Sequence, residues 1–176
     1  MNLTQRFFQE ARSNKDKAFR QMFLDSIDLT DTPIKRLIYE DNMLYFIKPS
    51  AFAEPIVDPL IGFKKERKTK IRVSPEAFIC EYIIAIDDLL SSIIDHEGKH
   101  AEQFSDPSLA LKHLVLEALP YQKPFEKLAL KLEEEAYSYQ MQKFPDRNIS
   151  ERFCNFINST YNMMLLAYPR LFKQSN

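Results

Sequence analysis

Hydrophobic and polar residues follow two different periods along this chain, and the period identifies the elements to expect. Over residues 1–27, large apolar residues recur at the three- and four-residue spacing of one helix face, which predicts an N-terminal helix. Over residues 33–73 the apolar runs are short, and Thr69, Ile71 and Val73 alternate with basic residues. Such alternation is typical of a strand with one buried and one solvated face. We therefore predict a small antiparallel sheet within residues 33–73.

Two expected strands of this sheet, at residues 37–39 and 44–47, flank a tight turn at Glu40–Asn42. A further strand is expected to begin at residues 61–63, and the alternating segment Lys68–Val73 forms the last one. Prolines between these segments indicate a loop.

Beyond Ser74 the sequence predicts an almost wholly helical chain. Ser74 and Pro75 suit the cap and the first position of a long helix over 75–104. Prolines then divide the helical part, 108–172, into helices at about 108–118, 123–143 and 149–172. Strands followed by a run of helices indicate an α+β fold. With 176 residues and no internal repeat, we expect one mostly helical domain with a small N-terminal sheet.

The composition excludes several classes of protein. The only two glycines, Gly62 and Gly98, cannot supply a phosphate loop, a dinucleotide fingerprint or a G-x-S-x-G nucleophile elbow. The formal net charge of −1 gives no global field that favours nucleic acid. The N-terminus does not resemble a signal peptide, and no apolar run approaches the roughly 20 residues of a membrane span. Cys80 and Cys154 lie among apolar residues, so we expect buried free thiols and a cytoplasmic location.

All three histidines fall in one short segment, and two of them belong to a metal-binding pattern. The residues His96-Glu97-Gly98-Lys99-His100 fit H-E-x-x-H. On a helix the two histidines project from the same side, so both can bind one tetrahedral Zn²⁺. Glu97 lies beside them, where it can take a proton from a zinc-bound water and pass it to a leaving amine. We predict His96 and His100 as zinc ligands and Glu97 as the catalytic base and acid.

A helical wheel of the predicted helix 75–104 supports this placement. One face, expected to be buried, carries Leu89, Ile93, His96, His100 and Gln103. Another face, expected to be solvated, carries Asp88, Ser92, Asp95, Lys99 and Glu102. Two histidines on a buried face are costly without a partner such as a metal ion.

The third ligand is expected from the acidic run on the predicted helix 123–143. Glu133 is bordered on both flanks by apolar positions, the placement that a metal-binding carboxylate needs. Glu134 lies on the solvated side, and Glu135 lies at the edge of the core stripe. Glu133 is therefore favoured, with Glu135 and Glu126, one heptad earlier, as alternatives.

The H-E-x-x-H motif followed on a second helix by Glu133-x-x-Ala136 resembles the zincin metallopeptidases, specifically the gluzincin arrangement. The resemblance covers Thr69–Gln140 and is to compact, minimal members of that group. It implies a zincin-like domain, a zinc-dependent peptidase activity and zinc ligation by both motif histidines and Glu133. It also implies that an edge strand ahead of the active-site helix lines the substrate cleft. We expect Lys68–Val73 to be that strand and to hold a peptide by backbone pairing.

The chain departs from the gluzincin pattern at one position. Many gluzincins have an aspartate four residues after the third ligand, where it supports a zinc histidine, and this chain has Tyr137. The residue with that role is therefore unassigned. Tyr137, Tyr161 and His113 are candidates for stabilising an oxyanion. A zincin-fold interaction or regulatory module without proteolytic activity is the alternative function.

The expected partner is a peptide or protein substrate, with no nucleic acid and no membrane span, and the oligomeric state is open. The run Lys64–Arg72 holds six basic residues in nine and favours a solvated loop and strand face. Its alternative role is a local site for an acidic segment. Gly98 interrupts the motif in mid-helix, where glycine costs about 1 kcal/mol relative to alanine. Either chance or the close approach of another backbone or of a substrate explains it.

Overall fold

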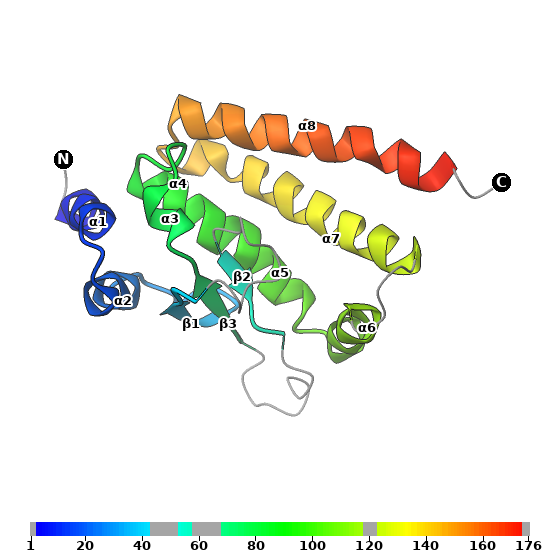
Figure 1. Cartoon of the computed structure of the whole chain (residues 1–176), viewed down its shortest axis with the longest axis horizontal. Helices are drawn as coiled ribbons and strands as arrows, with labels where there is room; N and C mark the ends of the chain where they lie inside the picture. Colours follow the sequence, from blue (N-terminus) through cyan, green and yellow to red (C-terminus); the bar gives the residue numbers. More distant parts are fainter. Residues whose placement is uncertain (1–2, 43–52, 58–67, 118–122, 174–176) are drawn as a thin grey trace.

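The computed structural model describes residues 3–42, 53–57, 68–117 and 123–173, which form a mostly helical α+β fold as predicted (Figure 1). Two helices and three strands come first: α1 (Leu3–Ser13), α2 (Lys17–Asp25), β1 (Ile34–Tyr39), β2 (Ala53–Pro55) and β3 (Thr69–Val73). The rest is helical: α3 (Glu76–Ile79), α4 (Ile86–Leu90), the π-helix η3 (Ser91–His96), α5 (Glu97–Gln103), α6 (Pro107–Glu117), α7 (Lys123–Gln142), the 3₁₀ turn η4 (Phe144–Asp146) and α8 (Glu151–Lys173).

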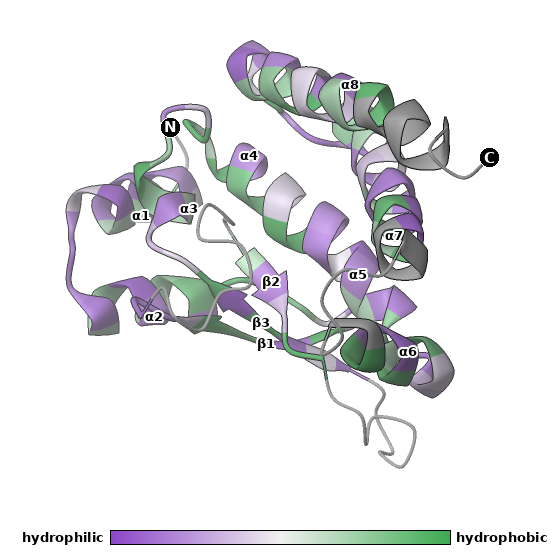
Figure 2. Cartoon of the chain, turned by 45° about the vertical axis from the view of Figure 1, so that its right-hand side comes forward, coloured by the Kyte–Doolittle hydropathy of each residue, from purple (hydrophilic) through white to green (hydrophobic). Residues whose placement is uncertain are grey.

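The continuous rod formed by α4, η3 and α5 lies at the centre of the molecule. It packs on the sheet through β2 and β3 on one side and against α7 on the other (Figure 1). The helix α8 covers α7, while α1 and α2 lie at the N-terminal end of the rod and α6 at its other end (Figure 2). The H-E-x-x-H segment therefore lies between the sheet and α7.

The three strands form a mixed sheet in the order β1-β3-β2. Only β2 and β3 pair antiparallel, so the predicted antiparallel sheet is wrong for β1, which pairs with β3 in parallel. Alternation of polar and apolar residues reports which face is buried and carries no information on strand direction. The prediction that Lys68–Val73 is an edge strand is also wrong, because β3 is paired on both sides.

The burial pattern of β3 follows its sequence. Thr69, Ile71 and Val73 are buried, and Lys70 is exposed. Arg72 pairs with Glu54 of β2 at 3.5 Å between Nη1 and Oε1. The described part of the predicted basic run thus lies on the solvated strand face. The predicted strands at residues 44–47 and 61–63 lie outside the described residues.

The predicted N-terminal helix over 1–27 is in fact two helices, α1 and α2. The Asp16 carboxylate accepts a hydrogen bond from the Phe19 N–H at 2.8 Å and caps α2. The Asn14 side chain accepts one from the Asp16 N–H at 2.9 Å. These local bonds stabilise a turn between the helices, which lets Phe8 and Phe23 meet in the core at a ring separation of 5.7 Å.

The predicted helix over 75–104 is also interrupted, at residues 80–85. Arg12 of α1 donates hydrogen bonds to the carbonyl oxygens of Phe78, Cys80 and Ile83. Gln9 donates to the carbonyl oxygen of Ile84 at 2.9 Å. The carbonyl groups that a continuous helix would satisfy internally are therefore satisfied by α1.

The expected solvated face of this helix is also wrong at three of its five positions. Asp88, Ser92 and Asp95 are buried, with exposed fractions of 0%, 5% and 4%. The Asp88 carboxylate accepts hydrogen bonds from the N–H and hydroxyl of Ser150, at 2.8 and 2.9 Å. Asp95 accepts two from the Arg147 guanidinium, at 2.6 and 2.8 Å. The chain entering α8 therefore covers a face that the wheel assigned to solvent.

Other expectations are confirmed. The helices α6, α7 and α8 begin and end within two residues of the predicted bounds. Cys80 and Cys154 are free, although both are half-buried and not fully buried as expected. Within the described residues, none of the helices combines the length and the apolar character needed to cross a membrane.

Gly98 is buried against β1, and the close backbone approach considered for it is absent from its surroundings. A Cβ atom at this position would lie 3.6 Å from the Ile34 Cδ1 atom, an ordinary van der Waals contact. We expect Gly98→Ala to raise the free energy of unfolding by up to about 1 kcal/mol through helix propensity. Gly98→Leu should lower it by about 1–3 kcal/mol through overpacking, while Lys99→Leu stays near wild type. Urea denaturation tests this, and equal tolerance of leucine at both positions would contradict it.

Candidate metal centre

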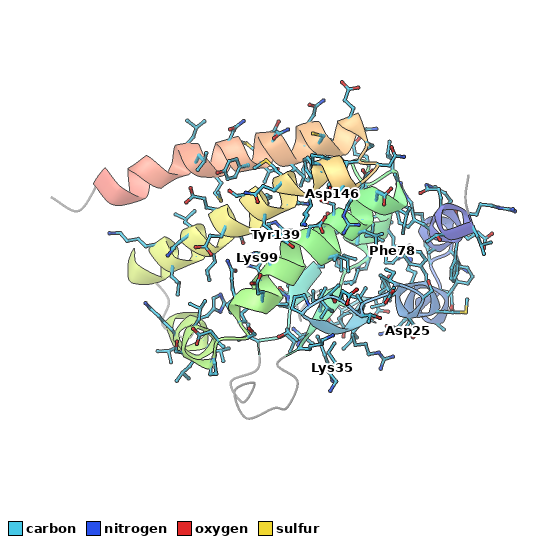
Figure 3. The ribbon with its side chains drawn as sticks, turned by 180° about the vertical axis from the view of Figure 1, so that it is seen from behind. Asp25, Lys35, Phe78, Lys99, Tyr139 and Asp146 are labelled. Carbon is cyan, nitrogen blue, oxygen red and sulfur yellow. The ribbon has the colours of Figure 1, made fainter. Side chains whose placement is uncertain are left out.

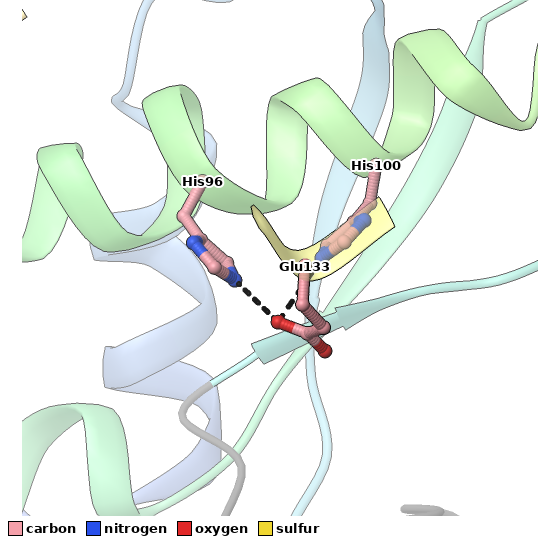
Figure 4. Close-up of side chains that lie close together, drawn as sticks. All are labelled: His96, His100 and Glu133. Carbon is pink, nitrogen blue, oxygen red and sulfur yellow. Dashed lines mark ion pairs between the residues drawn. The ribbon is translucent and has the colours of Figure 1, made fainter. Parts of the chain in front are cut away.

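The rod and α7 together bring three potential metal ligands to one point. His96 ends η3, His100 lies one turn later in α5, and Glu133 projects from the middle of α7 (Figure 4). The Glu133 Oε2 atom lies 3.4 Å from His96 Nε2 and 3.7 Å from His100 Nε2. All three potential ligand atoms lie within 4.8 Å of one another. These are the three residues that the sequence predicted as ligands.

Two of the three separations are close to those of a zinc site. In a tetrahedral site with bonds of about 2.0–2.1 Å, neighbouring ligand atoms are about 3.3–3.4 Å apart. The edge between His96 and Glu133 has this length, and the edge between His100 and Glu133 exceeds it by a few tenths of an ångström. Two imidazoles and one carboxylate are also a donor set that zinc accepts. The donor set and these two edges suit the metal, and the ligand atoms of the two histidines lie within 4.8 Å of each other.

Burial and charge act together on these groups. The exposed fractions are 8% for His96 and 7% for His100. Burial favours the neutral form of Glu133, but its contacts with the two imidazoles outweigh burial and hold the pKa of Glu133 well below its usual range. Burial likewise acts to lower the pKa of His100, but Glu133 and Glu97 raise it overall. Glu133 is therefore ionised, as a ligand must be.

Glu97 begins α5 and is half-buried beside the three ligands. Its charge contributes to the raised pKa values of both His100 and Tyr137, which places its carboxylate within electrostatic range of the site. Glu97 is absent from the group of residues whose atoms could bind one ion together. Glu97 thus lies close to the ligand group without belonging to it.

The two alternative third ligands differ from Glu133. Glu135 is exposed and makes contacts with Lys131, at 3.8 Å, and Gln103, at 3.1 Å, outside the ligand group. The side chain of Glu126 lies outside the described residues. Among the described acidic residues of α7, Glu133 is the one that meets both histidines.

Of the three candidate oxyanion donors, Tyr137 is the one in contact with a ligand. Its ring centroid lies 4.4 Å from that of His96. Burial, with the charges of Glu133 and Glu97, raises the pKa of Tyr137, so its hydroxyl keeps its proton. Tyr161 lies behind Tyr137, at 6.2 Å between ring centroids, and His113 packs on Phe104.

One polar residue at the site was not assigned a role from the sequence. Gln103 ends α5, and its Oε1 atom lies 2.8 Å from His100 Nδ1. The signal was present, because the wheel places Gln103 on the same face as both histidines. A glutamine alone does not identify a metal site, so the contact emerges only in three dimensions.

Comparison of the chain with known protein families, with curated protein sequences and with solved structures finds no match. The case for a function therefore rests on the side chains of the site.

Proposed function

We propose that this chain is a zinc-dependent metallohydrolase that cleaves peptide bonds in a peptide or protein substrate. The observation that supports it best is the meeting of His96 Nε2, His100 Nε2 and Glu133 Oε2, where both distances to Glu133 are close to the edge of a tetrahedral zinc site. Three protein ligands with one open position are typical of catalytic zinc, whereas structural sites use four. The H-E-x-x-H motif and its resemblance to gluzincins favour peptide hydrolysis as the reaction.

Each residue of the site has a distinct role in this proposal. His96, His100 and Glu133 would hold the ion, which would supply a Lewis acid for the scissile carbonyl and make water a better nucleophile. Glu97 removes a proton from the attacking water and gives it to the leaving amine. Its half-buried position and its electrostatic effect on His100 support this role.

Tyr137 is the proposed hydrogen-bond donor to the negative oxygen that develops during attack. Its raised pKa keeps the phenol protonated at neutral pH, as a donor must be. The contact of its ring with His96 fixes the phenol beside the ligands.

For substrate alignment, β2 replaces the segment predicted from the sequence. It lies at the end of the described sheet and packs against α5, whereas β3 is paired on both sides. We propose that an extended peptide aligns along β2. The two free cysteines, both half-buried, favour a reducing compartment such as the cytoplasm.

Zinc content and cleavage of a peptide library test the proposed function directly. We expect one equivalent of zinc per purified chain, cleavage that a chelator abolishes, and recovery when zinc is restored. Zinc binding without cleavage of any peptide would contradict the hydrolase and favour a metal-binding interaction module. Absence of zinc binding would contradict both functions.

A further inference from the structure

Gln103, the last residue of α5, has a side-chain amide that contacts residues of both helices that form the proposed metal centre, α5 and α7. Gln103 is 9% exposed and makes three polar contacts. Its Oε1 atom faces His100 Nδ1 at 2.8 Å. Its Nε2 atom donates hydrogen bonds to the Leu132 carbonyl oxygen at 3.3 Å and to Glu135 Oε2 at 3.1 Å. One side chain therefore links α5 to α7 next to the ligands.

The partners of Gln103 determine the orientation of its amide. A carbonyl oxygen and a carboxylate oxygen can only accept hydrogen bonds, so the group that faces Leu132 and Glu135 must be the NH₂. The amide oxygen is then left facing His100. Since that oxygen can only accept, His100 Nδ1 must carry the proton.

The position of this proton matters for metal binding. An imidazole that bears a proton on Nδ1 can offer the lone pair of Nε2, and Nε2 is the atom that faces Glu133 at 3.7 Å. The Leu132 carbonyl belongs to the peptide unit that joins Leu132 to Glu133. The amide that orients His100 therefore also ties it to the backbone of the third ligand.

We propose that Gln103 is the positioning residue of the metal centre. It holds His100 in the tautomer that binds metal and keeps the His100 Nε2 atom directed toward Glu133. This takes the role that an aspartate at position 137 would have in a gluzincin, where the chain has Tyr137 instead. The inference rests on the metal centre of the proposed function, and it does not require the chain to cleave peptides.

The chain offers a matched control in Gln140. This glutamine is 1% exposed and also links α7 to the rod, through a hydrogen bond from Nε2 to the Ser91 hydroxyl at 3.2 Å. It has no contact with any of the three ligands among the hydrogen bonds and ion pairs of the described residues. Replacing either glutamine with methionine keeps the size of the side chain and removes its hydrogen bonds.

Zinc affinity and histidine NMR test the role of Gln103. We expect Gln103→Met to weaken zinc binding about 10–100-fold, the usual effect of losing an outer partner of a metal ligand, and Gln140→Met to leave it within threefold of wild type. In zinc-loaded protein, the His100 Nδ1–H resonance should exchange slowly with water in wild type and in Gln140→Met. In Gln103→Met it should exchange fast. A general loss of stability would speed the exchange in both methionine variants, whereas loss of the hydrogen bond speeds it in Gln103→Met alone.

A rescue experiment separates the hydrogen bond from packing. The double variant Gln103→Glu, Glu135→Gln keeps an acceptor opposite His100 Nδ1 and restores a donor–acceptor pair between the two side chains with exchanged roles. We expect it to bind zinc more tightly than Gln103→Met.

Three results would overturn the inference: equal loss of affinity in both methionine variants, an unprotected His100 Nδ1–H in zinc-loaded wild type, or no rescue. The wild-type resonance keeps the test decisive even if Gln103→Met does not fold. Zinc-binding wild type that cleaves nothing would contradict the hydrolase and leave the role of Gln103 intact. Wild type without zinc would overturn both.

Discussion

Glu97→Gln is expected to abolish peptide cleavage while the protein still binds one zinc ion. Glutamine has the size of glutamate but cannot accept a proton, so water activation and protonation of the leaving amine are both lost. General acid–base catalysis contributes about 10²–10⁴-fold to a rate, and kcat should fall by at least this factor. Because Glu97 is outside the group of potential ligands, the zinc stoichiometry should not change.

The effect of this variant on zinc affinity should be small, because two effects of the Glu97 charge oppose each other. That charge contributes to the raised pKa of His100, so its removal lowers that pKa and protons compete less with zinc for the imidazole. The same charge also attracts the zinc ion, and this attraction is lost. Zinc affinity should therefore stay within about tenfold of wild type, and a loss far above about 100-fold would identify Glu97 as a ligand instead of a base.

Glu102→Gln is the control for Glu97→Gln. Glu102 lies on the same helix, its side chain is 60% exposed, and its carboxylate pairs with Lys99 at 2.8 Å (Figure 3 shows Lys99). Removing this charge should leave kcat and zinc binding close to wild type, because exposed ion pairs contribute little. Wild-type cleavage by Glu97→Gln would exclude the proposed mechanism.

The metal ligands could be predicted from the sequence because their geometry is largely local. Two histidines four residues apart on a helix must project together, and this depends only on the single turn from the end of η3 into α5. Glu133 is distant in sequence, but its position between apolar neighbours on α7 indicates that it faces the core. The structure brings these three side chains together as expected.

The rest of the rod depends on partners that lie far along the chain. Arg12 contacts the carbonyls of residues 78–83, and Arg147 neutralises Asp95 from 52 positions away. A wheel drawn on one segment contains none of these partners, so it assigns buried carboxylates to solvent. It also assumes 3.6 residues per turn throughout, and the π-helix Ser91–His96 departs from that period up to the first residue of the motif.

The parallel direction of β1 relative to β3 could not be predicted from the sequence for a related reason. A short turn at Glu40–Asn42 favours a hairpin and an antiparallel sheet, but β1 instead pairs with β3, which begins thirty residues after β1 ends. Parallel pairing needs a long crossover, and the chain between Tyr39 and Thr69 is long enough to supply one. A turn signal in the sequence favours pairing with the next strand along the chain, whereas β1 pairs with the distant strand β3.

Glu133→Gln is expected to cause the largest loss of zinc affinity among the acidic residues of α7. The substitution replaces an ionised ligand by a neutral amide of equal size and leaves two histidines, which bind zinc poorly by themselves. The loss should exceed the roughly 10–100-fold that follows from removing an outer partner of a ligand. Equilibrium competition with a chelator of known affinity measures it, and circular dichroism of the metal-free protein checks the fold.

Glu135→Gln provides the matched comparison for Glu133→Gln. It lies two residues away on α7, is exposed, and contacts Gln103 and Lys131 instead of the histidines. Glu135 would act on the ion only through Gln103, which itself contacts the ligand His100. Direct outer partners of a ligand contribute about 10–100-fold to metal affinity, so this more distant residue should contribute less than tenfold.

Equal losses of zinc affinity in the two variants would contradict the assignment of Glu133. A larger loss in Glu135→Gln would identify Glu135 as the third ligand. If neither variant weakens zinc binding, the third ligand must come from outside the acidic run Glu133–Glu135. The contacts of Glu133 Oε2 with the two histidines would then not contribute to zinc binding.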